Sequence, residues 1–161
     1  MHVCPLNSNI PSFVQALGPS LHHLEIASQF HDMDSNDAFA TLDLSSATSL
    51  KHFCAGSSTR VLSLIPWVLR IISQLPESSP PTLKILQIAF ASSRQFFLDL
   101  PFLRCLSSIL ARPGFSKLEI IHFVAFSNVP DEETKHEVIS TISTTLEEWN
   151  SKGVLRFTFP N

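Results

Sequence analysis

Glycine is scarce in this chain, and its scarcity argues against two classes of activity. Only four of the 161 residues are glycine. A loop that cradles a phosphate usually needs glycine, because the backbone must approach the ligand closely. A serine hydrolase of the common type needs a G-x-S-x-G turn, which is absent from the sequence. We therefore expect neither a nucleotide-binding loop nor a hydrolase, and no cofactor.

Cysteine is also rare, and its spacing excludes a disulfide framework. The three cysteines, Cys4, Cys54 and Cys105, are odd in number, far apart and without a C-x-x-C pair. The sequence has no N-x-S/T acceptor, and its amino terminus lacks a basic region followed by an apolar stretch. We expect reduced, mostly buried thiols and an intracellular protein, cytoplasmic or nuclear.

Charged residues make up only 16% of the chain, with a net charge of -3. Lysine and arginine are scattered singly along the sequence, so we expect no binding to nucleic acid or to anionic lipid. The longest apolar run, Val61 to Leu69, is interrupted by Ser63 and Pro66. It is well short of the roughly 20 residues that cross a bilayer, so no membrane association is expected.

Apolar residues, in contrast, are plentiful. They make up 44% of the sequence and include thirteen phenylalanines, although tyrosine is absent. A chain of this length can bury about 70% of its unfolded surface without metal or disulfide. We expect one domain over residues 1–161, with residues 1–9 poorly ordered.

Five segments share a strand-like pattern of leucine and isoleucine on alternate residues. The clearest is TLKILQIAF from Thr82, which contains the leucine-rich-repeat spacing L-x-x-L-x-I, and FSKLEIIHFVAF from Phe115 echoes it with isoleucine and phenylalanine at the later positions. Starts at Leu21, Leu50, Leu83, Leu118 and Val154 give intervals of 29, 33, 35 and 36 residues.

Helical patterns alternate with these strands. A short helix is expected over IPSFVQAL from Ile10, capped by Ser12 and ended by Gly18, and a longer one over Thr59–Leu75 with Pro66 in its first turn. The segment FATLDLSS, residues 39–46, is ambiguous between a short helix and an extended stretch.

Two further helices have clear boundaries. One is capped by Asp99, has Pro101 in its first turn and ends at Arg112-Pro113-Gly114. Cys105 is expected on the apolar face of this helix. The last starts at Asp131, repeats Val138, Ile142, Leu146 and Trp149 on one face, and ends at Gly153.

This alternation predicts an α/β fold. Strands joined by helices are parallel, and a nearly constant repeat favours a leucine-rich-repeat-like, right-handed solenoid arc of about five strands with helices on the convex side. The rival is a compact three-layer α/β sheet with helices on both faces. We favour the arc because the strand positions expected to face outward are largely polar.

The residues also resemble a known family. The segments LDLSSATSLKHF, IPWVLRIISQLP and LDLPFLRCLSSILARPGFSKLEIIHF, with the ending WNSKGVLRFTF, resemble the leucine-rich-repeat-like region of fungal F-box proteins of the mushroom type. The resemblance spans most of the chain and rests on degenerate leucine spacings. The resemblance implies that the chain recognises a substrate for a ubiquitin ligase. The F-box, the helical module by which such proteins dock on the ligase, is not found before Ile10.

Metal and thiol chemistry were considered and set aside. His22, His23, His31, Asp32 and Asp34 include suitable ligands, but adjacent strand residues point to opposite faces, so we expect no metal site. Cys54 or Cys105 could pair with His52 or His122 as nucleophile and base, but neither cysteine has a local catalytic signature, so packing is favoured.

Acidic residues on the last helix, from Glu132 to Glu148, are interpreted as a solvated face, and Trp67 and Trp149 as core.

We therefore expect a non-enzymatic protein-interaction module that binds a protein through the concave strand face. The predicted contact residues are His22, Glu25, His52, Lys84, Gln87, Lys117 and Glu119. Two alternatives stay open: a small α/β enzyme or ligand-binding domain with its site at the carboxyl ends of the strands, near Ala27, Ala55 and Ala91, or a family remnant without function.

Overall fold

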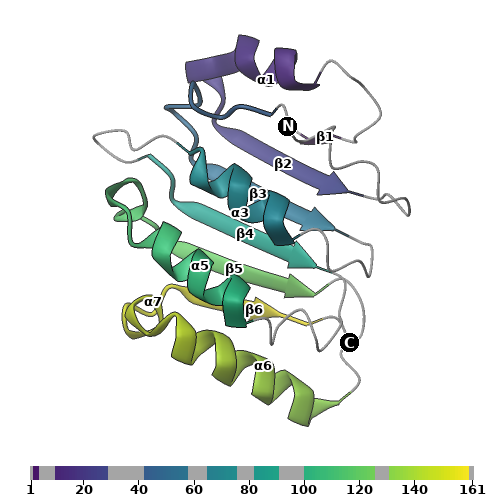
Figure 1. Cartoon of the computed structure of the whole chain (residues 1–161), viewed down its shortest axis with the longest axis vertical. Helices are drawn as coiled ribbons and strands as arrows, with labels where there is room; N and C mark the ends of the chain where they lie inside the picture. The colour runs from purple at the N-terminus through teal and green to yellow at the C-terminus, as the bar shows by residue number, and fades with distance from the viewer. Residues whose placement is uncertain are drawn as a thin grey trace.

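The computed structural model describes most of the chain, in seven stretches. These are residues 2–3, 10–28, 42–57, 65–75, 82–90, 100–125 and 131–159. Strands and helices alternate along them, and the strands form one sheet (Figure 1). The predicted α/β class is confirmed.

The sheet is parallel throughout, and its strands lie in the order of the sequence. Five strands contribute four to six residues each, and the two-residue β1 joins the edge beside β2. Their bounds are β1 His2–Val3, β2 His23–Ser28, β3 His52–Ser57, β4 Ile85–Phe90, β5 Ile120–Ala125 and β6 Leu155–Thr158. The prediction of about five parallel strands is therefore confirmed; of residues 1–9, only His2 and Val3 lie within the described ranges.

Four strands begin two residues after the leucine that predicted them. Leu21, Leu50, Leu83 and Leu118 are all at most 6% exposed. They are buried at the amino-terminal edge of the sheet, where the backbone already makes contacts between units: the amides of Lys51 and His52 both donate to the carbonyl of His22. The leucines thus mark the entry of each strand into the core.

Helices follow most of the strands. Their bounds are α1 Ile10–Leu17, α3 Ile65–Ser73, α5 Leu100–Leu110, α6 Glu132–Thr145 and α7 Glu147–Ser151, with single turns of 3-10 helix at η1 Gly18–Ser20 and η4 Pro113–Phe115. Pro66 and Pro101 occupy first turns as predicted, since a missing amide hydrogen costs nothing there. Thr59–Leu64 and Asp99 lie outside the described residues.

The last helical segment matches its sequence signals closely. A carboxylate oxygen of Asp131 accepts the amide hydrogen of Thr134 at 2.6 Å, which is the predicted cap. Val138, Ile142, Leu146 and Trp149 are all at most 3% exposed. Gly153 follows at φ +67°, a conformation that glycine adopts without strain.

Two local predictions about helices were wrong. The predicted single helix breaks at Leu146, whose backbone leaves helical geometry (φ -105°, ψ 43°) so that both Leu146 and Trp149 reach the core. Ser12 does not cap α1, because the helix already begins at Ile10.

The described part of the connection into β3 contains turns. Over residues 42–50 the chain makes two turns, and it still buries Leu42, Leu44, Ala47 and Leu50. The amide of Ser45 donates to the Asp43 carboxylate at 2.8 Å, and this hydrogen bond holds the pKa of Asp43 below its usual value. In the described part of FATLDLSS, residues 42–46, the chain forms no helix and turns at residues 45–46.

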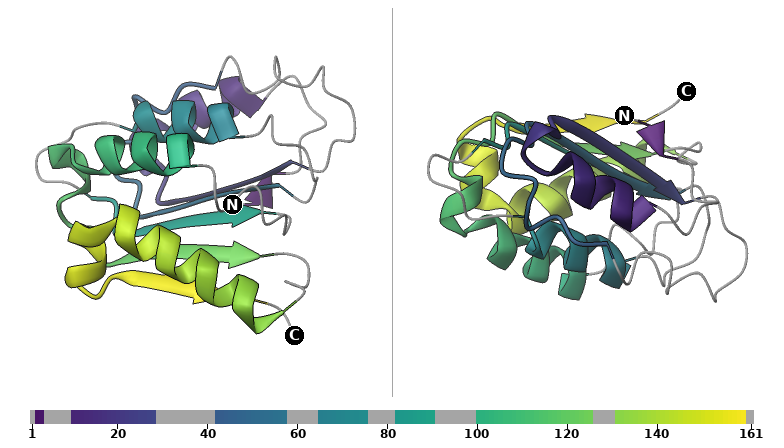
Figure 2. Two further views of the ribbon diagram at one scale, coloured as in Figure 1. Left: turned by 60° about the horizontal axis from the view of Figure 1, so that its bottom comes forward. Right: turned by 90° about the horizontal axis from the view of Figure 1, so that it is seen from above.

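The core lies between one face of the sheet and the helices. Alternate strand residues are fully buried: Leu24 and Ile26, Phe53 and Ala55, Leu86 and Ile88, and Ile121 and Phe123. Figure 1 shows α3, α5 and α6 in front of the strands, and Figure 2 shows the helices gathered on one side of the sheet. In the ranges that the structure describes, no helix covers the opposite face, so the rival three-layer arrangement is absent there.

No helix within the described stretches is both long enough and apolar enough to cross a membrane.

Alternation of the strands gives a direct test of this layer arrangement. Leu86 in β4 is 0% exposed on the helix side, whereas its neighbour Gln87 is only partly buried on the other face. Leu86→Ala should lower the free energy of unfolding by about 2–5 kcal/mol, because it leaves a cavity between sheet and helices. Gln87→Ala, the matched control, should cost about 0.5 kcal/mol or less. Urea denaturation measures both; equal losses would contradict the one-sided core.

Candidate functional site

The predicted contact residues divide into two groups in the structure. Glu25, His52 and Gln87 belong to strand positions of the face without helices, which we call the open face. His22, Lys84, Lys117 and Glu119 instead precede the strands and lie at the amino-terminal edge of the sheet. His22 and Glu25 are three residues apart in an extended chain, so their side chains cannot point the same way.

The open face carries a row of polar side chains across five strands. The register aligns Glu25, Cys54, Gln87, His122 and Arg156 as direct neighbours. Neighbouring strands lie about 4.8 Å apart, so this row spans the width of the sheet. We had not included His122 and Arg156 among the contact residues. They occupy the same place in their units as Gln87, a signal visible only when the units are aligned by strand register.

A histidine pair lies beside this row. His23 and His52 are direct neighbours on β2 and β3, with ring centroids 4.2 Å apart. Burial lowers the pKa of His52, and the charge of His23 lowers it further, while Glu25 opposes both effects. The Nε2 atom of His52 is buried and has no hydrogen-bond partner. A neutral ring is therefore favoured at this position.

Of the two thiols in the described residues, Cys54 is not set up as a nucleophile. Cys54 is 5% exposed, and burial together with the nearby Glu25 raises its pKa to about 12. A thiol with this pKa is almost entirely protonated at neutral pH, and the thiolate is the reactive form. Cys105 is exposed on α5, so its predicted burial was wrong: it lies beside the apolar stripe of the helix rather than within it. Cys4 lies outside the described residues.

His122 has a partner on the next strand. Its Nε2 atom is 2.8 Å from the hydroxyl oxygen of Thr158, and burial lowers the pKa of the ring. The closest basic residue to Cys54 in the row is therefore separated from it by Gln87. The Cys54–His122 couple that was considered from the sequence is therefore not formed. His52 lies on the same strand face two residues before Cys54, but the raised pKa of Cys54 keeps that thiol protonated.

No group of three or more metal-ligating side chains comes together within the described ranges. His31, Asp32 and Asp34 lie outside them. The proposed carboxyl-end site is described only in part: Ala55 is 0% exposed on the helix side, Ala27 lies within β2, and Ala91 falls outside the described residues. The side chain of Trp67 is likewise not described, while Trp149 is core, as predicted, at 3% exposure.

The second group of predicted residues surrounds a hollow at the amino-terminal edge. The hollow has a volume of about 470 Å³ and is lined by Lys51, Thr82, Lys84, Lys117, Leu118 and Glu119. The ammonium of Lys84 is 2.6 Å from a Glu119 carboxylate oxygen, and both side chains are more than half exposed. Lys51, which was not predicted, lies between His22 and Lys84 in the backbone hydrogen-bond pattern.

Side chains connect neighbouring units just behind this edge. The Thr82 hydroxyl lies 3.0 Å from the carbonyls of Thr48 and Leu50, to which it donates, and Nδ1 of His22 lies 3.0 Å from the carbonyl of Ser49. Arg112 donates to the carbonyl of Ser73 at the end of α3, at 2.7 Å. These bonds hold the backbone that positions the edge lysines.

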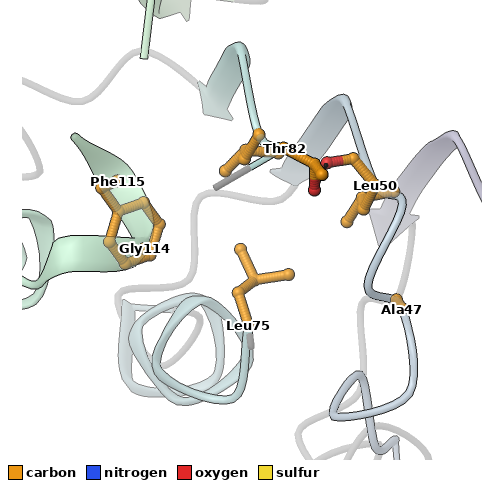
Figure 3. A pocket seen from close by; sticks show the side chains of 7 residues that line it. Ala47, Leu50, Leu75, Thr82, Gly114 and Phe115 are labelled. Carbon is orange, nitrogen blue, oxygen red and sulfur yellow. Dashed lines mark hydrogen bonds between the residues drawn. The ribbon is translucent and has the colours of Figure 1, made fainter. Parts of the chain in front are cut away.

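A small void lies beneath the same edge. Figure 3 shows Leu75 pointing into it from the end of α3, between Phe115 on one side and Thr82 and Leu50 on the other. Its volume is about 10 Å³, barely that of one water molecule, and most of its lining residues are apolar. The void is therefore a packing defect rather than a ligand site.

Comparison of the chain with models of known protein families, with curated proteins and with solved structures gives no significant match.

The contrast between the two thiols can be measured directly. At pH 8 about one Cys54 in ten thousand carries a thiolate, and its side chain is buried, so alkylation by iodoacetamide should be slow in the folded protein. Exposed Cys105 should react at least about tenfold faster. Mass spectrometry of a Cys4→Ser background resolves the two sites. Equal rates in folded protein, with both accelerated equally by urea, would contradict the assigned environment of Cys54.

The histidines of the open face should make stability depend on pH. The pKa values of His52 and His122 are lowered in the folded state. Between the folded and unfolded pKa values the unfolded chain therefore binds more protons, and stability rises with pH. The free energy of unfolding should fall as the pH drops from about 7.5 to about 5.5, because charging these rings favours unfolding.

Substitution tests this origin. The double variant His52→Gln, His122→Gln should flatten the slope of unfolding free energy against pH over that range, whereas His136→Gln, an exposed change on α6, should keep the wild-type slope. Urea titrations at several pH values provide the measurement. A double variant with an unchanged slope would show that other groups govern the pH dependence.

Proposed function

We propose that the chain is a protein-interaction module and that the open face of its sheet contacts the partner. The observation that carries this proposal is the composition of that face. In the described ranges it has no helix over it, and a mixed row of carboxylate, amide, imidazole and guanidinium groups crosses it from Glu25 to Arg156. Such a surface combines fixed backbone with side chains that can each donate or accept hydrogen bonds.

The units support a leucine-rich-repeat-like solenoid arc. Strand and helix alternate, the strand order follows the sequence, and the described helices α3, α5 and α6 return on the same side of the sheet (Figures 1 and 2). In Figure 1 the helices α3 and α5 cross in front of the sheet between one strand and the next strand below, which corresponds to a right-handed crossover. Solenoids built in this way use their strand-lined surface for binding.

We further propose that the module recognises substrates for a ubiquitin ligase inside the cell. This step rests on the resemblance of its leucine spacings to the repeat region of fungal F-box proteins.

Photocrosslinking tests the contact surface. A benzophenone amino acid at Gln87, in the centre of the open face, should crosslink a discrete partner in an extract of the source organism. The same group at Ser140, exposed on α6, should not. The substitution Gln87→Arg should also abolish capture through a second probe on the open face, at Thr158, two strands away. Identical products from both faces would contradict the proposal.

The ligase role needs a second step. Fusion of an F-box to the chain should lower the abundance of the captured protein in cells and leave it unchanged when the fusion carries Gln87→Arg. Capture without any change in abundance would retain the binding module and reject the ubiquitin role.

A further inference from the structure

The hollow at the amino-terminal edge concentrates positive charge in an acidic protein. Three of the five lysines in the chain, Lys51, Lys84 and Lys117, line it, accompanied by a single carboxylate, Glu119. The local charge is thus positive, although the whole chain has a net charge of -3. These lysines are more than thirty positions apart in sequence, and only stacking of the units brings them together.

The other two lysines behave differently. Lys135 lies 2.6 Å from Glu132, and Lys152 lies 2.6 Å from Glu148, each pair on one turn of helical surface. Among the described residues, Lys51 and Lys117 have no ion-pair partner, and Lys84 uses one of its three N–H donors on Glu119. The hollow therefore has unused donors that point to an anionic occupant.

We infer that this hollow binds an acidic peptide segment, rich in glutamate or aspartate, of the partner protein. The inference deepens the proposed function and rests on it, since it takes the occupant to be part of a protein. A volume of about 470 Å³ falls within the range of roughly 300–1,000 Å³ typical of ligand sites. Its open, lysine-lined form suits an extended chain better than an enclosed small molecule.

The geometry fits successive carboxylates. The amide of Lys84 donates to the carbonyl of Lys51 at 2.9 Å, so the two lysines occupy adjacent strands about 4.8 Å apart. Carboxylates at alternate positions of an extended peptide are about 6.6 Å apart, which is wider than the spacing of the strands. The flexible side chains of the lysines can bridge this difference. Leu118, only 6% exposed, provides an apolar contact for the peptide stem.

The charge distribution disfavours a nucleic acid as the occupant. A nucleic acid requires positive charge along many successive phosphates, and the surface outside the hollow is negative on balance. Glu119 already occupies one donor of Lys84, and its own charge reduces the attraction for any anion. The site therefore suits a few carboxylates that are positioned by their backbone.

The binding test uses a fluorescein-labelled hexaglutamate peptide and fluorescence anisotropy at low ionic strength. The triple variant Lys51→Gln, Lys84→Gln, Lys117→Gln should bind about tenfold more weakly than the wild type, since it loses three solvent-exposed ion pairs. The matched control Arg104→Gln, Lys135→Gln, Lys152→Gln also removes three positive charges, from the exposed Arg104 and Lys152 and the partly buried Lys135, so its loss should stay below about twofold. Glu119→Gln should strengthen binding. Circular dichroism confirms that each variant is folded.

Four outcomes would overturn the inference. The first two are that the wild type does not bind hexaglutamate, or that both triple variants lose the same affinity for it. The other two are that inorganic phosphate at matched charge concentration displaces the peptide, or that the wild type binds oligothymidylate more tightly than hexaglutamate. Because this assay contains no partner protein, it stands apart from the crosslinking test. If the probe at Gln87 captures no partner but the wild type still binds hexaglutamate selectively, the open face is rejected as the contact surface and the site at the amino-terminal edge is retained.

Discussion

The parallel backbone ladder is the constraint from which the rest of the structure follows. Each unit adds one strand in register with the previous one, so residues at equal positions become neighbours across the sheet. Alternation then sends every second side chain to the helix layer and the others to the open face. A shift by one residue would exchange these two sets and expose Leu86 and Ile88 to solvent. Burial of leucine on one face thereby fixes which polar residues appear on the other.

The same ladder produces both candidate surfaces. Within the strands it assembles the row from Glu25 to Arg156 from five separate units. One step earlier, at the amino-terminal edge, it places Lys51 beside Lys84 and brings Lys117 and Glu119 to the same hollow. Hydrogen bonds from Thr82 to the preceding unit hold this edge in place. The polar chemistry is therefore a product of stacking, and Lys84 and Gln87 occupy positions that the L-x-x-L-x-I motif leaves open.

Sequence patterns were most informative where a local cause determines the structure. Asp131, the first turn with its two glutamates, the step of Val138 to Trp149 and the glycine at 153 each act within one helix, and each was predicted correctly. The strands were also found, with starts two residues early, because their leading leucines are core residues that precede the ladder. The break at Leu146 was missed because it depends on how the helix packs against the sheet, which the local sequence pattern does not show.

Which residues share a surface was decided only by the tertiary structure. The alternation of strand and helix patterns in the sequence determined that the chain would form a parallel α/β sheet, since strands joined by helices run in the same direction. The spacing of leucine and isoleucine determined that one strand face would be apolar. It did not determine that Cys54 would be a buried, protonated thiol and Cys105 an exposed one, or that scattered lysines would gather at one edge. Those properties depend on the register between units far apart in sequence, which local periodicity does not encode.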